Sequence, residues 1–245
     1  MAVDLGRVPP NLGARRTSQP VRTQLAPLQI RSGERITFGS DSLTTGYNGA
    51  LSWPTGTGNF LDQVNTILGA GNHVVDVENG QPGTGIEYLA AHLDTLILNS
   101  APTMVILWCG VNDAISPLGV DDFQAKYTIV LARIKAALPG VKIACIGLGA
   151  YTTEHWEIDA STGLARWGPT QTPLDYYDIW IQNACAAMGA TFIDFRPWLL
   201  AWEVIHNPGG AAFPFATVDG THYNDAGQKQ IAACALQSKY FTVFP

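Results

Sequence analysis

A serine, an aspartate and a histidine are the residues of this sequence whose types and spacing could support acyl transfer. Ser42 lies just after a short β-rich run, and Asp219 and His222 lie on one short turn near the C-terminus. A serine nucleophile needs a histidine that removes its proton and a carboxylate that holds the histidine in the correct tautomer. The Asp-x-x-His spacing lets the carboxylate reach Nδ1 of the imidazole while Nε2 faces the serine. We therefore predict a catalytic triad of Ser42, His222 and Asp219.

Acyl transfer also needs hydrogen-bond donors for the negative charge that develops on the carbonyl oxygen. Three candidates are the backbone N–H of Ser42, the backbone N–H of Gly83 and the side-chain amide of Asn112. Gly80 and Gly85 are close rivals of Gly83, because all three glycines lie in one short stretch before a predicted helix. We expect these donors to form an oxyanion hole.

The candidate residues follow the predicted β-strands, which alternate with helical patterns along the chain. Such alternation is typical of parallel β-α-β units and predicts a three-layer α/β/α sandwich around a mostly parallel five-stranded sheet. In open sheets of this kind the carboxyl ends of the strands share one edge, where ligands bind. The predicted strands are 35–39, 73–77, 103–108, 142–148 and 191–195, and the predicted helices are 60–68, 86–97, 123–138, 174–188 and 224–240.

Two long stretches, 149–173 and 197–218, show neither pattern and are predicted to be loops. Long loops inside compact domains are usually functional or mobile. Trp156 and Trp167 in the first stretch are candidate substrate contacts, because an aromatic loop near a hydrolase site can stack on a sugar ring.

Four segments of the chain resemble the consensus blocks of the SGNH (GDSL-like) hydrolase superfamily. The resemblance covers roughly residues 34–242 and implies a flavodoxin-like sandwich that hydrolyses esters without a metal or cofactor. The family's oxyanion glycine falls on Gly83. The other three blocks are Ser40-Asp41-Ser42-Leu43, Gly110-Val111-Asn112-Asp113 and Asp219-Gly220-Thr221-His222.

One position departs from the family pattern. Ser40 stands where the family usually has glycine, and Gly39 lies one position earlier. The family's glycine shapes the turn and is not a catalytic group, so the assignment of the nucleophile is unchanged. Asp41 and Asp113 are predicted to support the residues beside them, Ser42 and Asn112.

The bulk composition describes a folded globular protein. The 245 residues are 47% hydrophobic and 14% charged, with a net charge of −6, which excludes a disordered chain. No apolar run is long enough to cross a bilayer, so membrane insertion is not expected. The first ten residues lack the uninterrupted apolar core of a secretory signal, and the compartment is left open.

The N-terminal residues form a basic arm on an otherwise acidic chain. Residues 1–35 hold six arginines against two acidic residues. We predict a proline- and arginine-containing arm over 1–33, which docks on its own domain or is flexible, and a hydrolase domain over 34–245. Arginines spread among prolines form no compact patch, so no nucleic-acid partner is expected. The oligomeric state is left open.

The cysteines provide neither a metal site nor a disulfide framework. Their spacing contains no Cys-x-x-Cys pair, and three of them lie in apolar stretches, where a small buried hydrophobic residue is the simpler interpretation. The four are Cys109, Cys145, Cys185 and Cys234.

Other enzyme classes lack their signatures in this sequence. The glycines of 80–85 have the spacing Gly-x-x-Gly-x-Gly, which matches neither nucleotide-binding fingerprint. The Gly-x-Ser-x-Gly elbow of α/β-hydrolases and the His-Glu-x-x-His of zinc hydrolases are also absent.

The sequence indicates the class of substrate only through weak features. No long amphipathic lid is evident, which disfavours long-chain lipids, and the aromatic loops favour sugars. We expect a serine esterase for short-acyl, acetyl-type esters, of the carbohydrate O-deacetylase kind, acting through an acyl-enzyme on Ser42. The alternatives are a lysophospholipase or thioesterase of the same fold, or a non-catalytic carbohydrate-binding module on an esterase fold.

Overall fold

Five parallel strands form the central sheet, in the order β3-β2-β4-β5-β8. The computed structural model describes residues 26–45, 60–69, 75–78, 80–115, 120–148, 157–158, 165–166, 174–206, 222–237 and 240–244. All five residues of β4 are buried, as expected of a strand covered on both faces. The strands are β2 (Arg35–Ser40), β3 (Val75–Glu78), β4 (Met104–Trp108), β5 (Lys142–Ile146) and β8 (Thr191–Ile193).

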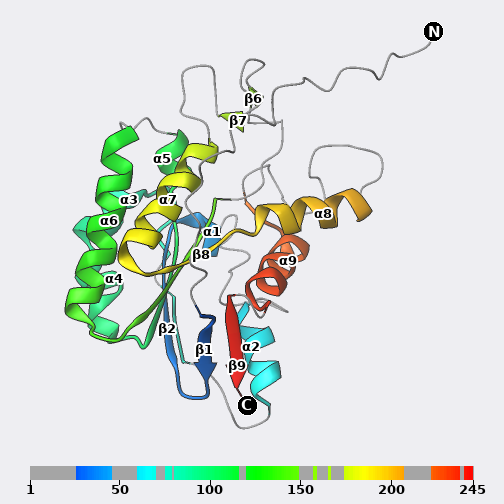
Figure 1. Ribbon diagram of the computed structural model, residues 1–245, viewed down its shortest axis with the longest axis horizontal. Coiled ribbons are helices and arrows are strands. Elements are labelled where there is room, and N and C mark those ends of the chain that lie inside the picture. The colour runs from blue at the N-terminus through cyan, green and yellow to red at the C-terminus, as the bar shows by residue number, and fades with distance from the viewer. Residues whose placement is uncertain are drawn as a thin grey trace.

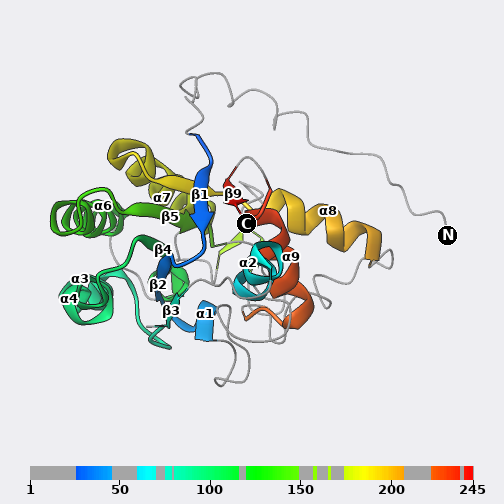
Figure 2. The ribbon, with the colours of Figure 1, turned by 90° about the horizontal axis from the view of Figure 1, so that it is seen from below.

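Helices cover both faces of this sheet, which confirms the predicted α/β/α sandwich (Figures 1 and 2). On one side α6 (Val120–Ala137) packs between α7 (Leu174–Met188) and α3 (Ile86–Ala91). On the other side α9 (Asp225–Ala235) packs between α2 (Phe60–Leu68) and α8 (Arg196–His206). The clearest periodic pattern of the sequence belongs to α6, whose buried face holds Phe123, Tyr127, Val130, Leu131 and Ile134.

Two short helices follow strand ends at the upper edge of the sheet in Figure 1. These are α1 (Ser42–Thr45) after β2 and α5 (Val111–Ile115) after β4. α1 begins with Ser42, and Asn112 is the second residue of α5, so these candidate site residues lie at the carboxyl edge of the sheet.

The predicted helix over 86–97 is interrupted in the structure. It ends as α3 at Ala91, and a separate turn, α4 (Leu93–Leu96), follows before a 3₁₀ turn, η2 (Leu98–Ser100). At the break, His92 leaves the helical region with φ −110° and ψ 17°. Its ring stacks on Tyr88 and its Nδ1 lies 2.9 Å from the Tyr88 carbonyl oxygen, so a local contact stabilises the break.

Two of the predicted strands were also too long at their carboxyl ends. The predicted strands 142–148 and 191–195 end at Ile146 and Ile193 in the structure. The predicted strand 73–77 is observed as β3 over 75–78, and residues 70–74 lie outside the described part of the chain.

A second, two-stranded sheet joins the two ends of the described chain. β1 (Leu28–Arg31) pairs in parallel with β9 (Phe241–Phe244), with Leu28 opposite Phe241. Ile30 is fully buried, and the Arg31 guanidinium lies 4.6 Å from the centre of the Phe244 ring. The end of the predicted arm 1–33 is therefore part of the fold, and the predicted helix 224–240 ends at Ala235. Residues 1–25 lie outside the described part of the chain.

The predicted loop over 197–218 was wrong in its first half. Residues 196–206 form α8, with Leu199 buried and Pro197 in the first turn, where a missing N–H costs nothing. In the other predicted loop, β6 (Glu157–Ile158) and β7 (Ala165–Arg166) pair as antiparallel strands. Residues 207–218 are not among those described.

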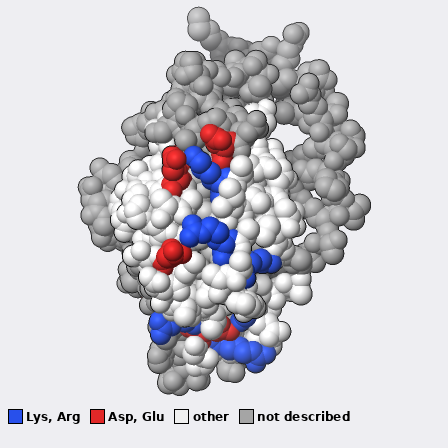
Figure 3. All heavy atoms as spheres, turned by 90° about the vertical axis from the view of Figure 1, so that its left-hand side faces the viewer, with Lys and Arg blue, Asp and Glu red and all other residues white. Residues whose placement is uncertain are grey.

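The outer face of α3, α4 and α6 carries acidic and basic side chains next to one another, as Figure 3 shows. Two ion pairs bridge these helices, Lys126 to Glu87 at 3.2 Å and Arg133 to Asp94 at 3.1 Å. Exposed pairs of this kind contribute little stability. All four cysteines are buried and free, whereas the sequence predicted burial for three of them. Within the described ranges, no helix is long and apolar enough to cross a membrane.

Candidate active site

The predicted nucleophile and the predicted base meet at the carboxyl edge of the sheet. His222 Nε2 lies 2.9 Å from Ser42 Oγ, and Ser42 is 8% exposed. Ser42 is the first residue of α1, directly after β2, and His222 lies shortly before α9. The structure thus brings together two of the three predicted triad residues. Asp219 lies outside the described residues, and its place in the triad stays a prediction.

The backbone that follows His222 is held by the two residues next in the chain. Tyr223 stacks on Trp108 of β4, with ring centres 5.6 Å apart, and its hydroxyl donates to the Leu148 carbonyl at 3.4 Å. Asn224 caps α9 by accepting from the Gly227 N–H. The packing of Tyr223 on β4 and the cap of α9 together fix the backbone position from which the His222 side chain extends. Sequence analysis missed Tyr223, because a buried aromatic residue beside a histidine has no distinctive pattern.

Asp41 caps the short helix that begins with the nucleophile. Its Oδ1 accepts from the Leu43 N–H at 2.9 Å, and its Oδ2 accepts from the Gly110 N–H at 3.4 Å. The side chain is fully buried, and this burial raises the pKa of Asp41 to about 7. One carboxylate therefore connects the turn after β2 with the turn after β4.

The glycine-containing turn follows β3 and is tied to β2. The Gln81 N–H donates to the Ser40 carbonyl at 2.9 Å, and both the N–H and the hydroxyl of Thr84 donate to the Gln81 carbonyl. Gly83 lies in this turn with φ +75°, a conformation that L side chains rarely adopt. Its rival Gly85 lies against the Asp113 carboxylate instead.

Asn112 contacts this turn directly. Its Nδ2 donates to the Thr84 carbonyl at 2.9 Å, which sets the orientation of the amide and leaves a second N–H on the same nitrogen. Thr84 was missed by sequence analysis, because it acts through its main chain. Gly110, two residues before Asn112, has φ +131°, and an added Cβ would lie 3.0 Å from Phe123.

Asp113 accepts from the N–H of Ile86, the first residue of α3. Both carboxylate oxygens lie within reach of that N–H, at 3.2 and 3.0 Å. A Cβ on Gly85 would lie 2.5 Å from Asp113 Oδ1, so a glycine is required for this approach. Desolvation raises the pKa of Asp113 to about 6. The Tyr177 hydroxyl donates to the Asp113 carbonyl at 3.0 Å and ties α7 to the same turn.

Ser40, the departure from the family pattern, is accommodated inside the sheet. Its hydroxyl donates to the Trp108 carbonyl at 2.6 Å, so the added polar group is satisfied by the last residue of β4. At Gly39, by contrast, a Cβ would lie 2.7 Å from Ile97 and 2.8 Å from Leu107. The position with no room for a side chain is therefore Gly39.

The remaining predicted site residues are not placed. Trp156 and Trp167 lie outside the described residues and stay predictions as substrate contacts. Among the residues that the structure describes, no cluster of three or more histidine, cysteine or acidic side chains could hold a metal ion.

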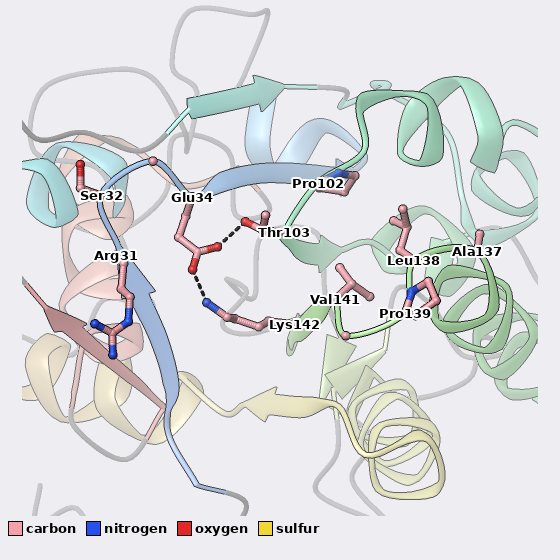
Figure 4. Close-up of a pocket in the computed structure, with 12 residues that line it drawn as sticks. Arg31, Ser32, Glu34, Pro102, Thr103, Ala137, Leu138, Pro139, Val141 and Lys142 are labelled. Atoms are coloured by element: carbon pink, nitrogen blue, oxygen red, sulfur yellow. Dashed lines mark hydrogen bonds and ion pairs between the residues drawn. The ribbon is translucent and has the colours of Figure 1, made fainter.

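A cavity of about 550 Å³ lies at the opposite end of the sheet from Ser42. It is bordered by the turn 31–34 between β1 and β2, by Pro102 and Thr103, and by residues 137–142 (Figure 4). Glu34 accepts from Thr103 Oγ1 and pairs with Lys142, and Lys142 also donates to the Gln29 carbonyl at 2.7 Å. These contacts fasten β1 to the start of the central sheet and are structural.

A parallel sheet with a serine–histidine pair at its carboxyl edge and helices on both faces defines a class of serine ester hydrolases. Residues 41–230 match the GDSL-like lipase/acylhydrolase family, and the chain belongs to that family. It is therefore a carboxylic ester hydrolase, as the resemblance to the SGNH superfamily implied. No curated protein matches the sequence.

Solved structures of related esterases share the fold. A GDSL-like lipase from Parabacteroides merdae superposes with a TM-score of 0.67 at 16% identity, over 87% of this chain and 98% of that one. The acetyl xylan esterase AlAXEase gives 0.63 at 21% identity, over 82% and 96%. An acetylxylan esterase from Geobacillus stearothermophilus gives 0.64 at 19% identity, over 87% and 97%.

Proposed function

We propose that this chain is a serine esterase that hydrolyses short-acyl, acetyl-type esters through an acyl-enzyme on Ser42. The observation that carries the proposal is the 2.9 Å distance between His222 Nε2 and Ser42 Oγ. At this distance the imidazole can take the hydroxyl proton as the oxygen attacks an ester carbonyl. Asp219, at the Asp-x-x-His spacing, is proposed to accept from Nδ1 and to hold the tautomer.

The oxyanion of the tetrahedral intermediate is proposed to bind three donors. The first donor is the backbone N–H of Ser42, next to the Leu43 N–H that donates to Asp41. The N–H of Gly83 and the second N–H of Asn112 Nδ2 complete the set. His222 then gives its proton to the leaving alcohol, and a water molecule hydrolyses the acyl-enzyme by the same steps in reverse order.

The proposed substrate class is an acetylated carbohydrate. Two of the structurally similar proteins are acetylxylan esterases. Mutants of the Geobacillus enzyme in a serine, an aspartate and a histidine are described as catalytic, and its aspartate and histidine are three positions apart, as are Asp219 and His222. Trp156 and Trp167 would supply rings for a sugar to stack on. A lysophospholipase or thioesterase is the alternative.

Hydrolysis of p-nitrophenyl acetate and p-nitrophenyl octanoate by the wild type and by Ser42→Ala tests the reaction. We expect acetate to be preferred and activity to be lost in the folded variant. Equal activity in the two proteins would show that Ser42 is not the nucleophile, and a preference for octanoate would favour the lipid-directed alternatives. Acetate release from acetylated xylooligosaccharides then tests the sugar.

A fluorophosphonate probe separates an enzyme from a binding module. A serine activated by His222 reacts covalently with the probe, so we expect labelling of the wild type and none of Ser42→Ala. A wild-type protein that stays unlabelled but binds xylooligosaccharides would support the non-catalytic alternative.

A further inference from the structure

The three proposed oxyanion donors come from three separate strand ends, so their relative positions depend on contacts between turns. β3, β2 and β4 are neighbours in the sheet, and Ser42, Gly83 and Asn112 follow them. The sheet aligns the strand ends, but each donor lies two or more residues beyond the last paired residue. One backbone hydrogen bond, from the Gln81 N–H to the Ser40 carbonyl, joins two of these turns, and side chains between the turns add further constraint.

Asp41 and Asp113 are the carboxylates that connect these turns. Asp41 joins the nucleophile turn to Gly110, which begins the turn carrying Asn112. Asp113 joins that same turn to Ile86, directly after the glycine-containing turn. The Asn112 amide donates to the Thr84 carbonyl at 2.9 Å, which is a second contact between these two turns. The contacts run in sequence from the Ser42 turn to the Asn112 turn and on to the Gly83 turn.

The two carboxylates differ in the number of N–H donors from which they accept hydrogen bonds. Asp41 uses one oxygen for the Leu43 N–H and the other for the Gly110 N–H. Asp113 directs both of its oxygens to a single N–H from another turn, that of Ile86. An asparagine has one acceptor oxygen and an NH₂ group that only donates. It can therefore replace Asp113 toward Ile86, but at position 41 its NH₂ group must face a backbone N–H.

We propose that Asp41 and Asp113 are positioning residues that hold the three oxyanion donors in register, with two acceptor oxygens required at position 41 and one at position 113. The inference rests on the proposed function and names the residues on which its oxyanion hole depends. A displacement of about 1 Å in a catalytic group can cost about a hundredfold in rate. Burial raises the pKa of both side chains, which means that this environment disfavours their ionised forms, while the backbone N–H groups that they accept from act in the opposite direction.

Asp178 provides a matched control at the same edge of the sheet. Its Oδ1 accepts from the Leu148 N–H at 2.7 Å, and its Oδ2 accepts from Arg196 Nη2 at 2.6 Å. Like Asp41 it is largely buried and serves two donors, and its side chain is 16% exposed. Unlike Asp41, its hydrogen bonds to described residues go to Leu148 and Arg196, which lie outside the turns that carry Ser42, Gly83 and Asn112.

The test measures kcat and KM for p-nitrophenyl acetate, together with Tm, in Asp41→Asn, Asp113→Asn, Asp113→Ala and Asp178→Asn. We expect kcat to fall about tenfold to a hundredfold in Asp41→Asn and in Asp113→Ala, with KM nearly unchanged. Asp113→Asn should keep kcat within about threefold of the wild type, because its amide oxygen still accepts from Ile86. Asp178→Asn should lower Tm while kcat stays within about twofold of the wild type.

Two results would overturn the inference while leaving the proposed function intact. One is a wild-type kcat in both Asp41→Asn and Asp113→Ala. The other is a loss of kcat in Asp178→Asn as large as that in Asp41→Asn, which would make the effect a general one of losing a buried carboxylate. If Asp41→Asn does not fold, the comparison of Asp113→Asn with Asp113→Ala decides the matter. A wild type without esterase activity would instead contradict the proposed function itself.

Discussion

His222 Nε2 lies 2.9 Å from Ser42 Oγ, although 180 positions separate the two residues in the chain. The sheet places Ser42 at the end of β2, and Tyr223, packed on Trp108, places the histidine above the end of β4. β2 and β4 are neighbours, with Ser40 opposite Trp108. The contact between Ser42 and His222 is therefore a consequence of strand order and of one stacked pair of rings.

The serine and histidine should act as one unit. Ser42→Ala and His222→Ala are each expected to lower kcat by roughly 10⁴-fold or more, because neither residue can activate the reaction alone. The double variant should be no slower than Ser42→Ala. Ester hydrolysis by purified proteins checks this, with thermal unfolding as the control for folding. Multiplied losses in the double variant would mean that the two residues act independently.

Ser42 could be predicted because a strand end leaves a strong signal, whereas His222 was predicted from the Asp-x-x-His spacing before the last helix. The continuous apolar run of β4 and the short run of β2 identify buried parallel strands, and the residues after them must share an edge. The helix α6 could be predicted equally well, since its apolar residues recur at helical spacing. Local patterns of this kind need no knowledge of distant contacts.

The sheet of β1 and β9 could not be predicted, because its pairing is non-local. β1 has the sequence Leu-Gln-Ile-Arg, and of its four residues only Ile30 is fully buried. By itself this sequence is not distinguishable from the polar arm that precedes it. Its partner begins at Phe241, at the far end of the chain. A four-residue run shows too few alternations to be told from a loop.

The contacts of Asp113 were also hidden from sequence analysis. The Asp after Asn112 was predicted to be a support, but nothing in the spacing pointed to Ile86 or to the close approach of Gly85. Gly85 was weighed only as a rival oxyanion glycine. Its role in the structure is to leave room for a carboxylate, which only the packing reveals.

Asn112→Ala should slow turnover by roughly a hundredfold or more, because one oxyanion donor is lost along with its contact to the Thr84 carbonyl. The loss is expected in kcat, with little change in KM, since the oxyanion exists only in the transition state and intermediate. Steady-state kinetics with p-nitrophenyl acetate measures both. A change confined to KM would assign Asn112 to ground-state binding.

Gly85→Ala should destabilise the protein by about 1–3 kcal/mol and reduce activity, because the added methyl group collides with the Asp113 carboxylate. Urea unfolding and ester hydrolysis measure the two effects. The double variant Gly85→Ala/Asp113→Ala is the control, since removing the carboxylate removes the collision. If Gly85→Ala costs the same free energy with and without Asp113, the collision is not its cause.

Stability should also depend on pH through the buried carboxylates, and Asp178 allows the sign to be tested away from the active site. Burial raises the pKa of Asp178 from 3.8 to about 6, although Arg196 beside it acts in the opposite direction. At a pH between these two pKa values, Asp178 is protonated in the folded chain and ionised in the unfolded chain. The contribution of Asp178 to the free energy of unfolding is therefore present below about pH 4 and is lost as pH rises toward about 6.

Asp178→Asn removes this titration, so urea unfolding of the wild type and the variant across that interval isolates it. The free energy of unfolding of the wild type minus that of Asp178→Asn should fall as pH rises from about 4 to about 6. Exposed acidic groups titrate equally in both proteins and cancel in the difference. A difference that rises with pH would mean that the ion pair with Arg196 outweighs desolvation and holds the pKa of Asp178 below 3.8.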